Sequence, residues 1–214
     1  MKKILVVFIS ILILMPEVKS STTSASSYIL MDQNTGRVLL SKDKDSQRLI
    51  ASITKIMTCI LALESGKSED VVIVDDNATS AYGSGIYIEV GEEIKLKDLL
   101  YGLMLRSGND AASMIAAYVS GSIEEFVKLM NNKAKELGMK NTIFYTPSGL
   151  PTPHGNLSSV YDMAILTRYA MQNKEYREIV STKKYKTSTK LIFVALATRQ
   201  SYHSIYAPVT HLYL

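Results

Sequence analysis

The order of its predicted elements constrains the fold of this chain most: strand patterns come first and helical patterns follow. Two short strand patterns, 28–32 and 37–41, flank a turn in which Gly36 supplies the positive φ that such turns require. Shorter strand patterns follow at 71–74 and 86–88. Helical patterns lie at 52–64, 96–105, 111–119, 123–137 and 158–172. Because strands and helices do not alternate, the sequence favours an α+β domain over a doubly wound parallel sheet.

The first 25 residues are typical of an export signal. Lys2 and Lys3 precede an apolar run of 12 residues, 4–15, which Pro16 ends ahead of a stretch of small residues. A membrane-spanning helix needs about 20 apolar residues, so the run favours a secretory signal peptide, with an uncleaved anchor as the alternative. We therefore expect a signal peptide at 1–25 and a protein that works outside the cytoplasm, in the cell wall or at the outer face of the cytoplasmic membrane, with membrane association left open.

Charge and cysteine content exclude several classes of protein. The formal net charge is +4, and half of it comes from the leader, which leaves too little for a nucleic-acid surface. Cys59 is the single cysteine and the chain has three histidines, so neither a disulfide framework nor a structural zinc site is expected. Cys59 lies in an apolar stretch and is expected to be buried. We expect no cofactor.

Ser52 and Lys55, at the start of the first long helical pattern, are the first candidates for chemistry. A hydroxyl and an amine three residues apart project from one face of a helix and can meet. Serine is a poor nucleophile until a base takes its proton, and a lysine with a lowered pKa can be that base. The motif alone is weak and also fits a serine cap with an exposed lysine. The same spacing recurs at Ser41 with Lys44 and at Ser181 with Lys184.

The second constellation is Ser107-Gly108-Asn109, between two helical patterns, and it is the only Ser-x-Asn triplet in the sequence. These three residue types resist helix continuation, so they predict a turn whose polar side chains are free to face a cleft. The alternative is a helix-capping turn, because Asn109 and Asp110 are good caps.

Together these motifs resemble those of the penicillin-recognising serine enzymes, most closely the low-molecular-mass D-alanyl-D-alanine carboxypeptidases. The resemblance runs from about Tyr28 to about Lys186. It implies a β-lactamase/transpeptidase-like α+β fold, in which an antiparallel sheet is packed with helices and joined by a helical lobe. The segments that carry the resemblance are ASITKIMT (51–58), GEE (91–93), LLYGLMLRSGNDAA (99–112) and TPSGLP (146–151).

The resemblance also implies an acyl-enzyme mechanism on peptidoglycan pentapeptides that end in D-Ala-D-Ala. Ser52 would attack the penultimate D-Ala carbonyl, and Lys55 would accept its proton. Ser107 would relay a proton to the leaving amine, while Asn109 would hold the substrate amide and orient Lys55. β-Lactam antibiotics would acylate Ser52 because their strained ring presents an equivalent carbonyl. No metal is required.

The third motif of the family, Lys-Thr-Gly on a strand that lines the cleft, does not occur in this sequence. Its nearest counterpart, Lys186-Thr187-Ser188, has a serine in place of the glycine. In the family the motif binds the substrate carboxylate, and its strand supplies the second oxyanion-hole amide. Loss of one such donor costs on the order of 2.7–4 kcal/mol, so we expect weak or absent turnover.

Beyond about residue 190 the pattern departs from the closing strands of the family. We expect a partial catalytic domain at 26–190, a sheet incomplete at its C-terminal side, and a divergent tail at 191–214 that results from truncation or a disrupted reading frame. A Lys-Thr-Gly continuation in another frame of the downstream nucleotides would support this hypothesis, and its absence would refute it. The alternative is a tail that still forms a strand, because residues 192–194 have the propensity for one.

Two other functions stay open on the sequence. A β-lactamase would share the fold and the first motif, but Gly108 and the lack of a clear glutamate-bearing deacylation loop argue against it. A non-catalytic binder of cell-wall peptides or penicillin, or an inert relic, would keep the motifs without turnover.

Overall fold

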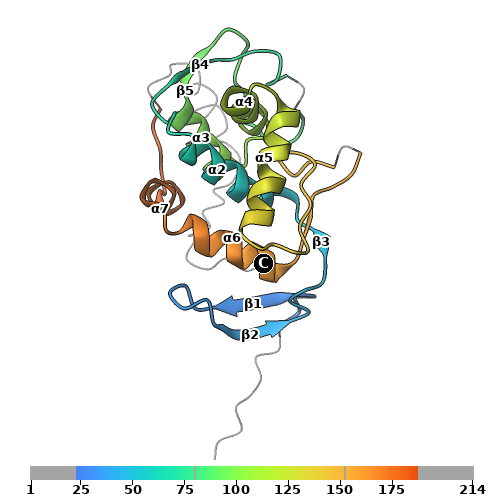
Figure 1. Ribbon diagram of the computed structural model, residues 1–214. Coiled ribbons are helices and arrows are strands. Elements are labelled where there is room, and N and C mark those ends of the chain that lie inside the picture. Colours follow the sequence, from blue (N-terminus) through green and yellow to red (C-terminus); the bar gives the residue numbers. More distant parts are fainter. Residues whose placement is uncertain (1–22, 80, 152, 188–214) are drawn as a thin grey trace, which may run out of the picture.

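The computed structural model describes residues 23–79, 81–151 and 153–187, whose helices form one body with small sheets at its edges (Figure 1). Within them, three two-stranded antiparallel sheets pair β1 with β2, β3 with β6, and β4 with β5. The expected α+β class is confirmed. The elements are β1 (Tyr28–Met31), β2 (Val38–Lys42), β3 (Arg48–Leu49), the 3₁₀ turn η1 (Ala51–Thr54), α2 (Lys55–Glu64), β4 (Val71–Ile73), β5 (Glu93–Lys95), α3 (Leu96–Arg106), α4 (Asn109–Ser120), α5 (Ile123–Glu136), β6 (Leu157–Ser158), α6 (Val160–Ala170) and α7 (Lys174–Ser181).

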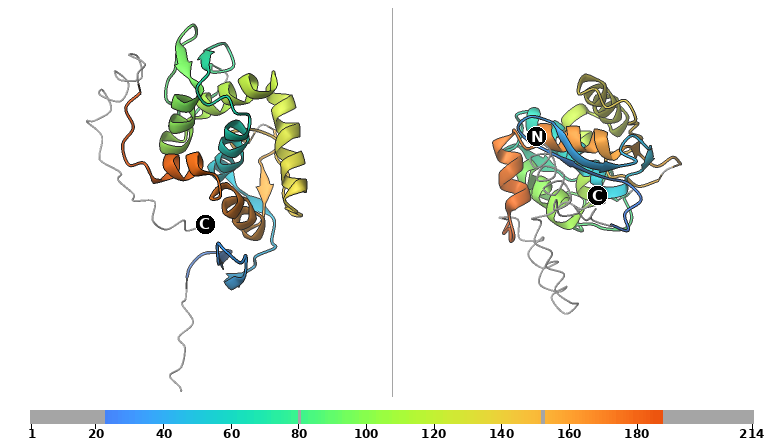
Figure 2. Two further views of the ribbon diagram at one scale, coloured as in Figure 1. Left: turned by 60° about the vertical axis from the view of Figure 1, so that its left-hand side comes forward. Right: turned by 90° about the horizontal axis from the view of Figure 1, so that it is seen from below.

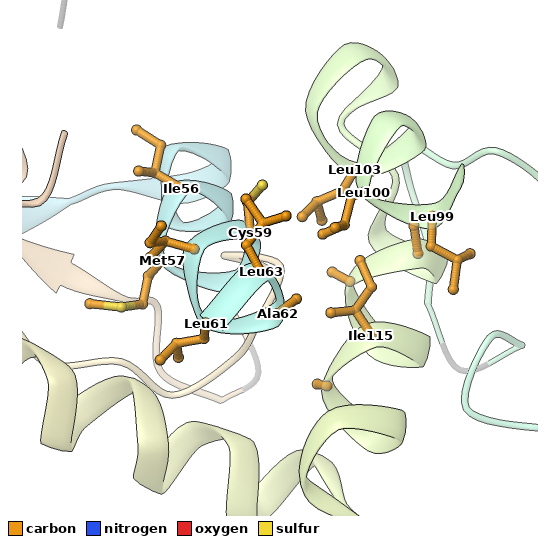
Figure 3. Close-up of a cluster of buried hydrophobic side chains, with 14 of the residues drawn as sticks. Ile56, Met57, Cys59, Leu61, Ala62, Leu63, Leu99, Leu100, Leu103 and Ile115 are labelled. Carbon is orange, nitrogen blue, oxygen red and sulfur yellow. The ribbon is translucent and has the colours of Figure 1, made fainter. Parts of the chain in front are cut away.

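Helix α2 is the centre of the core. Nine of its ten residues are buried, Lys55 and Cys59 among them. Cys59 is buried as expected, and burial raises the pKa of its thiol. A helix buried on all faces is held from every side, so the residue that begins it is held too. Figure 3 shows the apolar side chains of α2 opposite those of α3 and α4, among them Leu99, Leu100, Leu103 and Ile115.

The β1–β2 hairpin has the predicted strands and turn, with Gly36 at φ 75°. It lies beside α6, at the end of the molecule opposite β4 and β5 (Figures 1 and 2). Arg168 of α6 fastens the turn, because its guanidinium donates hydrogen bonds to the carbonyl oxygens of Gln33 (2.8 Å) and Asn34 (2.9 Å).

Two element predictions are wrong in detail. The helix does not begin at Ser52: that residue lies in η1, and α2 begins at Lys55, because the positive φ of Ala51 (40°) turns the chain into a tight 3₁₀ entry. Residues 86–88 form no strand, because the backbone N–H groups of Ile86 and Tyr87 donate to the Asp110 carboxylate instead of a neighbouring strand. The short elements β5 and α7 were not expected.

The predicted leader, 1–25, and the predicted tail, 191–214, lie outside the described residues apart from 23–25, so both stay predictions. None of the helices in the described part of the chain combines the length and the apolar character needed to cross a membrane.

Asn156, fully buried, joins the loop between α5 and β6 to η1. Its Oδ1 accepts from the N–H groups of Tyr145 (2.7 Å) and Thr146 (3.0 Å). Its Nδ2 donates to Thr54 Oγ1 (2.9 Å) and to the Thr146 carbonyl oxygen (2.8 Å). The four bonds use the full capacity of the amide, so this side chain holds the loop at a set distance from η1.

Asn156→Ala should therefore lower the free energy of unfolding by about 2–4 kcal/mol, because it leaves buried donors and acceptors without partners. Asn34→Ala, at an exposed side chain, should stay within about 0.5 kcal/mol of the wild type. Urea unfolding followed by circular dichroism measures both. An Asn156→Ala variant as stable as the control would contradict the role of this network.

Candidate active site

Lys55 is a charged residue at the buried start of α2, with 2% of its surface exposed. Its Nζ donates hydrogen bonds to Ser52 Oγ (3.2 Å), to Asn109 Oδ1 (2.8 Å) and to the Ser148 carbonyl oxygen (2.8 Å). These are as many partners as an ammonium group has protons. Burial lowers the pKa of Lys55 to about 8, against the opposing effect of the negative charge of Asp110.

Two of the three partners determine how the neutral amine points. The oxygens of Asn109 and Ser148 are carbonyl oxygens, which accept and cannot donate, so each requires an N–H from Lys55. A neutral amine has only two N–H groups, so its lone pair faces the remaining partner, Ser52 Oγ. Deprotonated Lys55 is therefore arranged to take the proton of the Ser52 hydroxyl, which lies in an exposed position on η1.

Asn109 is the first residue of α4, and a second contact orients its side chain. Its Nδ2 donates to the Tyr82 carbonyl oxygen (2.7 Å), which places Oδ1 toward Lys55. Its backbone N–H donates to the Ser84 carbonyl oxygen (2.8 Å). Ser52, Lys55 and Asn109 are thus brought together by hydrogen bonds, and their roles stay predictions.

Ser107 is not joined to this group by a hydrogen bond. It ends α3 in the left-handed conformation (φ 55°, ψ 38°) and is partly exposed. Among the described residues, its hydroxyl has no hydrogen-bond partner. Its role as a proton relay stays a prediction.

Comparison with known proteins identifies the family. The family model for D-alanyl-D-alanine carboxypeptidase, peptidase S11, matches residues 15–206. The chain belongs to this family. It is 45% identical over 163 residues to D-alanyl-D-alanine carboxypeptidase DacF of Bacillus subtilis, which covers 74% of this chain and 42% of that protein. It is 38% identical over 155 residues to DacD of Escherichia coli, with 67% and 40% covered.

The chain therefore spans about two fifths of the length of these two relatives. Among solved structures, it is similar to a D-alanyl-D-alanine carboxypeptidase from Mycobacterium tuberculosis, with a TM-score of 0.75, 30% identity, and 78% of this chain and 63% of that chain covered. It is also similar to a mutant DD-transpeptidase of Streptomyces K15, with a TM-score of 0.73, 32% identity, and 80% and 71% covered. The expected transpeptidase-like fold is confirmed.

Backbone strain gathers around the residues that carry the family motifs. Four non-glycine residues in the described part of the chain have a positive φ, and three of them adjoin this group: Ala51 (40°), Tyr87 (60°) and Ser107 (55°). Such conformations cost roughly 1–3 kcal/mol each and persist only where the surrounding structure holds them in place. They are often found at functional sites. The strained residues thus lie close in the chain to the residues that form or support the hydrogen bonds of Lys55.

The 146–149 turn is part of the site, which the sequence did not reveal. Its proline and glycine predicted a turn, but nothing local indicated that it would pack on α2. The Ser148 carbonyl oxygen accepts from Lys55, and the Pro147 carbonyl oxygen accepts from Thr58 Oγ1 (2.6 Å). Gly149 has φ 87°, and a Cβ there would lie 1.9 Å from the Ala51 carbonyl oxygen. Ala51, the residue before Ser52, is therefore in direct contact with this turn.

A recess of about 450 Å³ lies nearby in the chain, but none of Ser52, Lys55, Ser107 and Asn109 lines it. Its walls are the 83–87 loop and the end of α3, which contributes Leu105 and Arg106. No group of histidine, cysteine or carboxylate side chains suited to hold a metal ion is found among the described residues.

In the nearest counterpart of the third motif, Thr187 contacts the first turn of α3. Thr187 Oγ1 donates to Asp98 Oδ2 (2.8 Å) in the first turn of α3, at the opposite end of that helix from Ser107. The neighbouring Tyr185 also donates to Asp98, and its ring stacks on Tyr101 at a centroid distance of 3.6 Å.

Gly149→Ala should destabilise the protein by about 3 kcal/mol or more, because the added Cβ overlaps the Ala51 backbone and the positive φ is strained as well. Gly66→Ala is the matched control: its φ is 71°, but nothing lies within 4 Å of the added Cβ. Strain alone should cost the control about 1–2 kcal/mol. Equal losses in the two variants, measured by urea unfolding, would argue against the close contact of the 146–149 turn with η1.

Proposed function

We propose that this protein is a serine-type D-alanyl-D-alanine carboxypeptidase that acts on peptidoglycan pentapeptides through a Ser52 acyl-enzyme. The carrying observation is the Lys55 amine, whose lone pair faces Ser52 Oγ once Asn109 and Ser148 have taken its two N–H groups. Membership of the family supports the choice of substrate. The sequence of the first 25 residues supports a site of action outside the cytoplasmic membrane, with membrane association through that segment as the alternative to its cleavage.

In the acylation step, Ser52 Oγ bonds to the carbonyl carbon of the penultimate D-Ala while its proton passes to Lys55 Nζ. The tetrahedral intermediate then collapses, its C–N bond breaks, and the departing D-Ala amine takes up a proton. Ser107, two residues before Asn109, would relay that proton from Lys55. Water then hydrolyses the ester on Ser52.

The negative oxygen of the intermediate needs hydrogen-bond donors. The Ser52 backbone N–H is one candidate, because the first N–H groups of a helical segment have no partner within it. The second donor of the family belongs to the Lys-Thr-Gly strand, and this sequence has no such triplet. We therefore expect turnover to be slower by roughly 10² to 10³ than in a chain that carries the motif.

Incubation with a fluorescent penicillin, followed by intact-mass measurement, tests the acyl-enzyme. The full chain should gain the mass of one penicillin, and Ser52→Ala should gain none. Ser41→Ala is the matched control, because Ser41 has the same spacing to a lysine but lies exposed on β2 and should not affect the adduct. A wild-type chain without an adduct would refute the proposal and favour a relic, whereas rapid penicillin turnover would favour a β-lactamase.

The acylation rate should rise with pH and reach half its maximum near pH 8. The reason is the lowered pKa of Lys55: below about 8 the amine is protonated and cannot accept the Ser52 proton, and above it the lone pair is free. Stopped-flow fluorescence with the same penicillin gives the profile. Lys44→Ala, at the partly exposed lysine that follows Ser41 at the same spacing, should leave the midpoint in place. A midpoint near 10.5 in the wild type would exclude a buried Lys55 as the base.

A further inference from the structure

Asp110, the residue after Asn109, is a buried carboxylate whose main partners lie far away in the sequence. It is 7% exposed. Its Oδ2 accepts from the backbone N–H groups of Ile86 (3.0 Å) and Tyr87 (2.7 Å), and its Oδ1 accepts from that of Ala111 (2.8 Å). Because two of these donors belong to the 82–87 loop, capping of its own helix does not account for the contacts of Asp110.

The 82–87 loop is the element that orients Asn109. The Tyr82 carbonyl oxygen accepts from Asn109 Nδ2 at 2.7 Å and so turns Asn109 Oδ1 toward Lys55. Asp110 holds the other end of the same loop at Tyr87, whose positive φ of 60° requires such a restraint. The fit is tight, because a Cβ on Gly85 would lie 3.0 Å from Asp110 Oδ2. Loss of the carboxylate would therefore release the loop and, with it, the Asn109 amide.

The charge of Asp110 also acts on Lys55. The three groups that contact the Lys55 amine, from Ser52, Asn109 and Ser148, carry no charge. Among the described residues, Asp110 is the charged side chain whose Coulomb interaction affects Lys55, and it raises the pKa that burial lowers. The negative charge of Asp110 thus offsets part of the cost that burial imposes on the ammonium form of Lys55.

We propose that Asp110 is a positioning residue for the Ser52–Lys55 pair: its carboxylate fixes the 82–87 loop, and that loop orients the Asn109 amide toward Lys55. This inference rests on the proposed function, in which Ser52 and Lys55 are the reacting pair. Asp110 touches neither the nucleophile nor the substrate in this role.

The first experiment measures the titration of Lys55 directly and does not need catalysis. In the full chain labelled with ¹³C-lysine, the Lys55 resonance is assigned by its loss in Lys55→Arg and is followed against pH. Asp110→Asn should move its midpoint to lower pH than in the wild type. Asp162→Asn is the matched control: Asp162 is equally buried and accepts from the Asn141 N–H (2.6 Å) and Thr142 Oγ1 (2.8 Å), so its loss should destabilise the fold without moving the midpoint.

The second experiment separates the loop from the charge. In the penicillin assay, Asp110→Asn should lower the plateau rate by roughly 10- to 100-fold and shift the profile to lower pH. Gly85→Ala crowds the carboxylate but keeps its charge, so it should lower the plateau while the Lys55 midpoint stays near that of the wild type. This variant also tests the loop contact if Asp110→Asn fails to fold.

The outcomes distinguish the two proposals. A wild-type chain that is not acylated refutes the proposed function, whereas the Lys55 titration still decides whether the charge of Asp110 acts on the amine. An unchanged midpoint in Asp110→Asn, or a shift equal to that in Asp162→Asn, overturns the charge effect. A plateau in Gly85→Ala equal to that of the wild type overturns the positioning of Asn109 through the loop.

Discussion

The burial of the Lys55 amine is the constraint on which the rest of the site depends. Removing a charged group from water costs several kcal/mol unless partners replace the lost hydration. The partners come from three places in the fold, namely η1, the first turn of α4 and the 146–149 turn, at sequence separations of 3, 54 and 93 residues. One amine thus requires three distant segments to meet, which only the folded helical body achieves.

The segments that meet at Lys55 are held by contacts that leave little freedom. α2 is enclosed by α3 and α4 (Figure 3), so the position of Lys55 follows from the core. Asn156 joins the loop that carries Ser148 to η1, and Gly149 permits that loop to contact Ala51. Ala51, with its strained φ, lies between such contacts, because the Ile50 N–H also donates to the Asn156 carbonyl oxygen (3.1 Å). Packing and buried hydrogen bonds therefore compensate for the strain and for the desolvated charge.

Features that depend on the local residue pattern could be predicted from the sequence. The hairpin, the long helices and the meeting of the Ser52 hydroxyl with the Lys55 amine follow from periodicity and spacing, and the structure has them. Contacts across the fold could not be predicted. The alternation at 86–88 is that of a strand, but its N–H groups bind a carboxylate 23 and 24 residues away. Nothing near Ser148 indicates that its carbonyl oxygen would meet an amine on α2.

The proposed chemistry has two parts, activation of Ser52 and recognition of the substrate carboxylate, and the described residues bear on the first. Ser52, Lys55 and Asn109, to which we assign the acylation step, are joined to the helical body, whose core contains no residue of the β1–β2 hairpin. That hairpin is a two-stranded sheet with Leu30, Leu39 and Leu40 about half exposed, and such a sheet is only marginally stable without a partner element. The arrangement of Ser52, Lys55 and Asn109 therefore rests on η1, α2, the start of α4 and the 146–149 turn. In the proposed function, recognition of the substrate carboxylate is a separate requirement, which the resemblance places on the strand of the third motif.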